Sequence, residues 1–79
     1  MKDLKDRLNI TKAILRSLSR QPTSRTELTK QAIRVGGSYA SFTAIFCFLL
    51  AEGYIEKGGS ELRAPYRITE KGLRMLEAL

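Results

Sequence analysis

Two adjacent glycines, Gly36 and Gly37, divide the middle of the chain and constrain its fold more than any other feature. Glycine tolerates the positive φ angles that a sharp turn between two helices requires. A helix is predicted before the pair, because Ser24 and Glu27 have the spacing of a capping box, in which each side chain accepts a hydrogen bond from the other residue's amide. A second helix is predicted after the pair, since Ser38 can cap its first turn. We therefore expect two short helices joined by a tight turn.

Apolar residues recur at helical spacing on both sides of this turn. Before the turn, with Ile33 on the flank, the stripe consists of Leu28, Ala32 and Val35. After the turn, and before Gly53 ends the segment, it consists of Phe42, Ile45, Phe46 and Leu49. This pattern is typical of a helix-turn-helix, a scaffold that places its second helix in a groove of DNA.

The sequence ahead of this unit predicts another helix over residues 2–19. Its apolar positions at helical spacing are Leu4, Leu8, Ile10, Ile14, Leu15 and Leu18. Alternatively, Asn9 or Thr11 caps a shorter helix that begins later. Gln21 and Pro22 end the helix, and a short extended piece over residues 20–23 can add an edge strand.

After Gly53, residues 54–57 and 65–68 alternate polar and apolar side chains, as half-buried strands do. A loop over residues 58–64 joins them into a hairpin. Thr69 then caps a final helix that carries Leu73, Leu76 and Leu79. The predicted fold class is therefore α+β and mostly α, with residues 1–79 forming a single domain of ordinary size.

Two stretches resemble motifs of known regulators. Residues 49–57, LLAEGYIEK, are similar to the exit from the recognition helix in MarR-like and PadR-like regulators. Residues 66–73, YRITEKGL, are similar to the Tyr-x-Leu-Thr-x-x-Gly pattern that begins their last helix, with Ile68 in place of leucine. The resemblance implies a winged helix-turn-helix with a three-helix core, a two-stranded β-hairpin wing and a C-terminal helix. The small size and the scarcity of labile residues also resemble small winged-helix proteins of archaea and of their plasmids and viruses.

The charge is distributed unevenly along the chain and indicates a polyanionic partner. Residues 1–34 carry nine basic and three acidic side chains, residues 35–51 carry none, and residues 52–79 carry five of each. Lys and Arg neutralise phosphates and release the counterions that are condensed on DNA. A basic half beside an uncharged helix therefore predicts binding to double-stranded DNA, although a solvated basic surface would give the same charge pattern.

We predict that residues 38–51 form the recognition helix in the major groove and that the wing, residues 57–65, contacts the backbone or the minor groove. The outward positions expected to meet the bases are Ser38, Tyr39, Ser41, Thr43 and Ala44. The basic residues expected to bind phosphates are Arg25, Lys30, Arg34, Lys57 and Arg63. The helix offers no Arg, Asn or Gln for bidentate readout, so base discrimination should be modest or depend on Tyr39, water and DNA shape.

A competing interpretation is a winged helix that serves as a protein-interaction module in a larger assembly. Cys47, Phe48 and Leu50 flank the uncharged helix and would form an apolar patch for a protein partner. Cys47 itself is interpreted as a small hydrophobe that fills a gap, because no second cysteine is present to support a redox switch.

The residue types that catalysis requires are scarce. Histidine is absent, and the sequence has neither a cysteine cluster at metal spacing nor a glycine-rich phosphate loop. We therefore predict no enzymatic activity, no metal or other cofactor, and no small-molecule effector. The first twenty residues carry charges throughout, and the longest apolar run, residues 44–51, is too short to span a membrane. These features predict a cytoplasmic protein with no membrane partner.

Both ends of the chain carry apolar residues beyond those that a three-helix core needs. They are Leu4 and Leu8 in the first helix and Met75 and Leu79 in the last. We therefore expect a homodimer formed by the two ends, an arrangement that the winged-helix resemblance also implies. The alternative is that residues 1–8 fray and that Leu79 is simply terminal.

Overall fold

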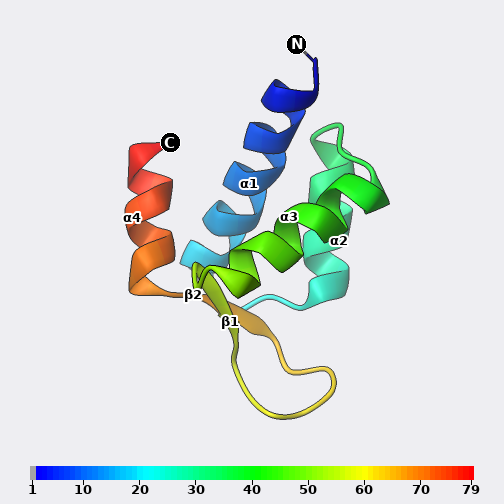
Figure 1. The fold of residues 1–79 in the computed structure, drawn as a ribbon. Coiled ribbons are helices and arrows are strands. Elements are labelled where there is room, and N and C mark those ends of the chain that lie inside the picture. The colour runs from blue at the N-terminus through cyan, green and yellow to red at the C-terminus, as the bar shows by residue number, and fades with distance from the viewer. Residues whose placement is uncertain (1) are drawn as a thin grey trace.

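A computed structural model describes the backbone of residues 2–79 and the side chains of residues 7–79. Three helices come first, an antiparallel two-stranded hairpin follows, and a fourth helix comes last (Figure 1). In chain order, the elements are α1 (Lys2–Arg20), α2 (Arg25–Arg34), α3 (Tyr39–Ala51), β1 (Ile55–Lys57), β2 (Tyr66–Ile68) and α4 (Glu70–Ala78). This order confirms the predicted α+β class, mostly α, with the layout of a winged helix-turn-helix.

Helix α1 is continuous, so the shorter helix capped by Asn9 or Thr11 does not occur. The Thr11 hydroxyl instead donates a hydrogen bond to the carbonyl oxygen of Arg7, at 2.8 Å, within the helix. The buried apolar residues of α1 are Ile10, Ile14, Leu15 and Leu18. Leu8, which the sequence analysis counts among the apolar residues beyond the core, is 43% exposed, because α1 extends here past the elements that cover its later turns (Figure 1). The side chain of Leu4 lies outside the described residues.

The turn between α2 and α3 has the predicted chemistry. Gly36 adopts a φ of +96°, in the region that side chains with a β-carbon rarely enter. Gly37 lies against α1, where a β-carbon would come within 2.6 Å of the Ile10 side chain. Ser24 and Ser38 each accept a hydrogen bond from the amide three residues later, so both predicted N-caps form.

The apolar stripe of α2 is shorter than the sequence predicts. Leu28 and Ala32 are fully buried, whereas Val35 is 41% exposed. Val35 is the C-cap of α2, with φ −91° and ψ 16°, so the chain turns away from the helical path there. Its side chain therefore does not continue the buried face.

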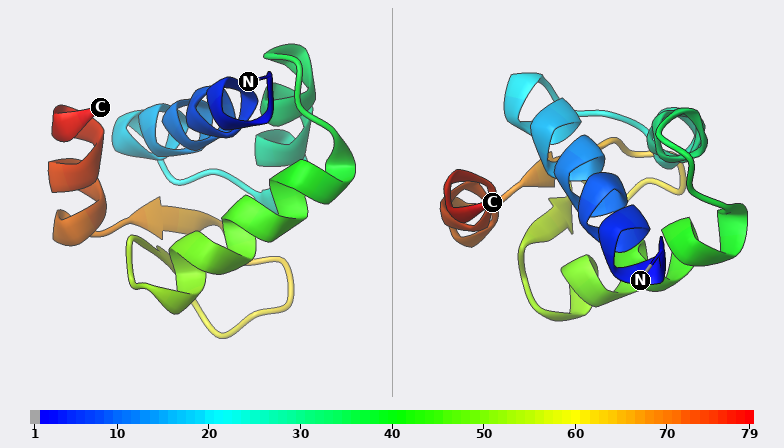
Figure 2. Two further views of the ribbon diagram at one scale, coloured as in Figure 1. Left: turned by 45° about the horizontal axis from the view of Figure 1, so that its top comes forward. Right: turned by 90° about the horizontal axis from the view of Figure 1, so that it is seen from above.

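The core lies where α1, α2, α3 and the hairpin meet (Figure 2). Helix α3 contributes the four predicted residues Phe42, Ile45, Phe46 and Leu49. The rings of Phe42 and Phe46 stack with their centroids 5.2 Å apart. The ring of Phe46 also meets Tyr66 of β2 edge to face, at 4.8 Å. Helix α3 is therefore packed against the rest of the core and against the base of the wing.

The hairpin is short and joins a third segment. Its paired residues are Ile55 with Ile68, Glu56 with Arg67 and Lys57 with Tyr66. Each strand begins one residue later than predicted. The expected edge strand over residues 20–23 is reduced to one bridge, in which Thr23 and Tyr66 exchange backbone hydrogen bonds of 3.0 and 2.9 Å. This bridge fixes the base of the wing to the segment between α1 and α2.

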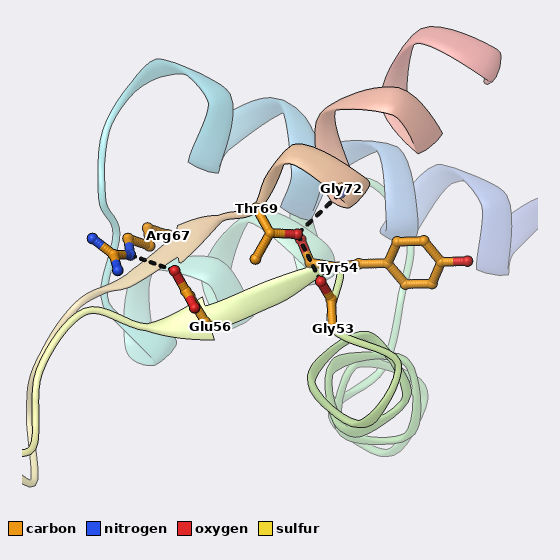
Figure 3. Close-up of polar contacts among 6 residues, drawn as sticks. All are labelled: Gly53, Tyr54, Glu56, Arg67, Thr69 and Gly72. Atoms are coloured by element: carbon orange, nitrogen blue, oxygen red, sulfur yellow. Dashed lines mark hydrogen bonds and ion pairs between the residues drawn. The ribbon is translucent and has the colours of Figure 1, made fainter.

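The end of α3 is joined to the start of α4 by Thr69 (Figure 3). The Thr69 hydroxyl oxygen accepts a hydrogen bond from the amide of Gly72 at 3.1 Å and donates to the carbonyl oxygen of Gly53 at 2.6 Å. The Thr69 amide donates to the carbonyl oxygen of Tyr54 at 3.1 Å. The ammonium of Lys71 lies 4.7 Å from the centre of the Tyr54 ring. One residue therefore caps α4 and holds the turn that leads out of α3.

Replacing Gly72 by alanine tests this junction. A β-carbon at Gly72 would lie 2.1 Å from the carbonyl oxygen of Tyr54, and a backbone atom cannot move aside as a flexible side chain can. We expect Gly72→Ala to lower the free energy of unfolding by about 1–3 kcal/mol, as overpacking does, despite the better helix propensity of alanine. Urea denaturation followed by circular dichroism measures this change.

Gly59→Ala is the matched control, because its β-carbon would meet the Ala64 side chain at an ordinary 3.6 Å. Its free energy of unfolding should stay close to that of the wild type. Equal stability of the two variants would contradict the close contact between α4 and the turn.

Candidate nucleic-acid interface

Helix α3 presents small, uncharged side chains on the side that faces away from the core. The exposed residues there are Ala40, Ala44, Cys47 and Ala51. No charged side chain occurs between Val35 and Ala51. A surface of methyl and thiol groups lets the helix backbone approach a partner closely, and alanine methyls can contact thymine methyls in the major groove.

The hydroxyl groups at the start of α3 are less available for hydrogen bonds to a partner than the sequence predicts, because they bond within the helix. The Ser38 hydroxyl accepts from the Ser41 amide at 3.1 Å and donates to the Ser41 hydroxyl at 3.0 Å. The Thr43 hydroxyl donates to the carbonyl oxygen of Tyr39 at 2.9 Å. Ser41 alone of these three keeps a hydroxyl proton for a partner, while Thr43 offers its methyl group and acceptor lone pairs. Tyr39 is 62% exposed at the first position of α3.

Four of the predicted phosphate-binding residues line two adjoining depressions. One, of about 250 Å³, is lined by Arg25, Thr26, Thr29, Lys30 and Tyr39. The other, of about 660 Å³, lies between the start of α2 and the wing and is lined by Ser24, Arg25, Thr26, Lys57, Leu62, Arg63, Ala64 and Tyr66. Arg25 and Thr26 belong to both depressions, so one strip of surface connects them. We call Arg25, Lys30, Lys57 and Arg63 the basic band.

The basic band keeps its charges available for a partner. The two ion pairs among the described side chains, residues 7–79, join Arg67 to Glu56 at 2.7 Å and Arg74 to Glu70 at 3.1 Å. Neither pair includes a residue of the band. Among the described side chains, the four cations of the band on one side of α3 have no ion-pair partner, a distribution that favours an anionic partner.

Arg25 is held in place by the core. Its guanidinium carbon lies 5.3 Å from the centre of the Phe46 ring, whose edge-to-face partner is Tyr66. This cation–π contact fixes the position of Arg25 between the two depressions. Arg25 therefore packs over the Phe46 ring in addition to contributing a charge to the basic band.

The structure does not bring all predicted site residues together. Arg34 is exposed near the end of α2 and lines neither depression. Ala44 lines a separate depression of about 290 Å³ with Arg7, Thr11, Ile45 and Phe48, between α1 and α3. Ser41 projects from the flank of α3 that carries Phe48, seven residues later, rather than the flank of Tyr39. The predicted base-contacting residues are thus spread around α3 rather than gathered on one line.

Six residues that line the two depressions are not among the predicted site residues: Ser24, Thr26, Thr29, Leu62, Ala64 and Tyr66. Thr26 borders both depressions. Its position four residues before Lys30 on the same helix gave a usable signal, because residues at that spacing are neighbours. Leu62, at the end of the wing, is 91% exposed and had no signal, since nothing in a loop sequence fixes where a side chain projects.

The apolar patch expected from Cys47, Phe48 and Leu50 does not form as one surface. Leu50 packs against the core, whereas Phe48 is 51% exposed and lies 6.1 Å from the Tyr54 ring. Cys47 is exposed opposite the buried face of α3, so its interpretation as a gap-filling residue is wrong. The three side chains project in different directions because they occupy different positions around the helix.

The described residues form neither a metal-binding cluster nor a membrane-spanning helix. No group of three or more His, Cys, Asp or Glu side chains among residues 7–79 is arranged to hold a metal ion. None of the helices over the described part of the chain is long and apolar enough to cross a membrane.

Comparison with known protein families identifies the fold class. The winged helix-turn-helix family matches residues 5–79, and the chain belongs to this family. Members are typically non-catalytic DNA-binding proteins, so the match suggests DNA binding. Neither a search of curated proteins nor a search of solved structures gives a match.

The different chemistry of the basic band and of α3 gives a prediction for mutants. Lys57→Ala should weaken binding to duplex DNA about equally for all sequences, because an ammonium group binds phosphate without reading a base. Tyr39→Ala and Thr43→Ala should instead change the ranking of sites, because these side chains project from the start of the helix. Selection of bound sites from a random duplex library measures both effects.

Arg74→Ala is the control for charge, because Arg74 lies on α4 and pairs with Glu70. It should bind like the wild type. Variants of Tyr39 and Thr43 that rank the library as the wild type does would contradict the assigned role of α3.

Proposed function

We propose that the chain binds double-stranded DNA as a small transcriptional regulator, with sequence preference but modest discrimination. The observation that carries this proposal is the pairing of an uncharged, small-residue face on α3 with four unpaired cations beside it. Such a surface suits a duplex, whose bases lie in a groove between two lines of phosphates. Helix α3 enters the major groove, and the basic band binds the backbone along one side of it.

The wing extends the same contact. Its loop lies on the far side of α3 from the ends of the chain (Figure 1). Lys57 and Arg63 line the larger depression together with the start of α2. The proposal therefore places the wing on the backbone or the minor groove next to the site that α3 occupies. Arg34, at the other end of α2, is proposed to bind a phosphate nearer the turn.

A regulatory role is supported by the likeness to MarR-like and PadR-like regulators. The residues of that likeness include Gly53, Thr69 and Gly72, which build the junction between α3 and α4. The proposed regulator acts in the cytoplasm without a cofactor, as one unit formed by residues 1–79. The archaeal likeness of the sequence remains a prediction.

Salt dependence tests the proposed binding. The basic band and Arg34 together provide five cations, so log Kd plotted against log salt should have a slope of about 4 to 5 per subunit. Fluorescence anisotropy with a random duplex between about 50 and about 200 mM salt measures this slope. A flat response would contradict the phosphate contacts. Failure to bind at every salt concentration would favour a protein partner instead.

We further propose that the regulator is a homodimer formed through α1 and α4. Leu8 of α1 and Leu73 and Leu79 of α4 are exposed. The two helices contact each other, and both chain ends lie away from the wing (Figure 1). Met75, which was expected to add to this surface, packs against the core instead. A twofold pair would leave the two α3 helices free to enter successive major grooves.

For a homodimer, sedimentation equilibrium at tens of micromolar should give a mass above the 8.9 kDa of one chain. Leu8→Glu combined with Leu79→Glu should sediment as a monomer, because the charges would be buried at the interface. Leu62→Glu, at the exposed end of the wing, is the control and should keep the mass of the wild type. A wild type that sediments as a single chain would contradict the dimer.

A further inference from the structure

Arg7 projects from the face of α1 that packs on the core. It precedes Thr11, Ile14 and Leu18 by four, seven and eleven residues, spacings that place all four on one side of a helix. Thr11, Ile14 and Leu18 are buried, whereas Arg7 is exposed. Arg7 lines a depression together with residues of α3, and α1 and α3 contact each other. In the ribbon, the first turns of α1 lie over α3 (Figure 2).

The depression between α1 and α3 places Arg7 next to the outer surface of α3. Arg7 lines this depression of about 290 Å³ together with Ala44 and Phe48. Phe48 follows Tyr39 by nine residues, which is half a turn around the helix. Since Tyr39 borders the basic band, Arg7 lies on the opposite flank of α3 from that band. Helix α3 itself supplies no carboxylate to compete for the guanidinium.

The width of the major groove determines what a cation on this flank of α3 would contact. A helix with its side chains is about 10–12 Å across, and the major groove is about 12 Å wide. Phosphates of the two strands therefore line the two flanks of a helix that lies in the groove. The basic band lies on one flank only, and among the side chains of residues 7–79 that line the depression on the flank of Phe48, Arg7 supplies the cation that faces the other line of phosphates.

We propose that Arg7 binds a backbone phosphate of the second DNA strand, so that α1 and the basic band hold α3 from both sides of the major groove. This inference rests on the proposed duplex binding and adds to it a contact that the helix-turn-helix and the wing do not provide. The ligand is a phosphodiester, and the contact carries no information about the base sequence.

A matched pair of variants tests the proposal. Arg7→Ala and Arg16→Ala remove the same charge from the same helix, but Arg16 follows Arg7 by nine positions and therefore lies on the opposite face of α1. Arg7→Ala should reduce the slope of log Kd against log salt by about 0.9, and Arg16→Ala should leave the slope unchanged. Arg7→Lys should restore the slope, because it returns the charge. Circular dichroism confirms that each variant is folded.

Ethylation interference on a bound duplex locates the contact. The wild type should be sensitive to ethylated phosphates on both strands across one major groove. Arg7→Ala should lose the sensitivity at one phosphate position on one strand, and Lys57→Ala should lose it at one position on the other strand, where Arg25, Lys30 and Arg63 keep their contacts. Equal slopes and equal interference patterns for Arg7→Ala and Arg16→Ala, with a wild type that binds, would overturn this inference alone. A wild type that does not bind would overturn the proposed function itself.

Discussion

The arrangement of α3 and the wing depends on the hydrogen bonds of Thr69. Its hydroxyl group caps α4 and binds the carbonyl oxygen of Gly53, and its amide binds that of Tyr54. These carbonyls belong to the turn between α3 and β1, so α4, α3 and the wing meet at one place (Figure 3). Gly72 allows this close packing, because any side chain there would collide with the carbonyl oxygen of Tyr54. The distance between the outer face of α3 and the cations of the wing is consequently set by the backbone.

A second line of contacts fixes the basic band to the same frame. Arg25 lies over Phe46, Phe46 meets the edge of Tyr66, and Tyr66 exchanges two backbone hydrogen bonds with Thr23. A cation–π contact at such a site contributes about 0.5–1 kcal/mol, which is enough to orient a guanidinium without neutralising it. Arg25 thus stays charged and in place between α2 and the wing. Little side-chain freedom remains to be lost when a phosphate binds.

Local features of this fold could be predicted from the sequence, and features that depend on distant neighbours could not. The caps at Ser24, Ser38 and Thr69 and the turn at Gly36 follow from residues within four positions, and all of them form. The packing of Met75 against the core depends instead on where α4 lies relative to the other helices, which no periodicity reveals. The same limit applies to the site: the sequence identified the cations of the basic band, but their grouping depends on the Thr23–Tyr66 bridge, which holds the start of α2 beside the wing. The bond from the Thr43 hydroxyl to the carbonyl oxygen four residues earlier follows from a local rule that the sequence analysis did not apply, whereas the Ser38 cap was predicted.

Helix α3 carries no charge, so under the proposed function affinity and selectivity come from different parts of the molecule. A bidentate side chain on a base contributes about 1–3 kcal/mol of discrimination, and α3 has none to offer. The cations lie on α2, the wing and α1, where under the proposed function they would meet phosphates that every sequence shares. Under the proposed function, affinity then comes from the flanks, whereas selectivity comes from methyl contacts, Tyr39 and the shape of the groove that α3 must fit. Weak selectivity in one subunit is multiplied when two copies must fit two half-sites at a fixed spacing. A helix with so little base chemistry therefore gains more selectivity from a second subunit than from any single added contact.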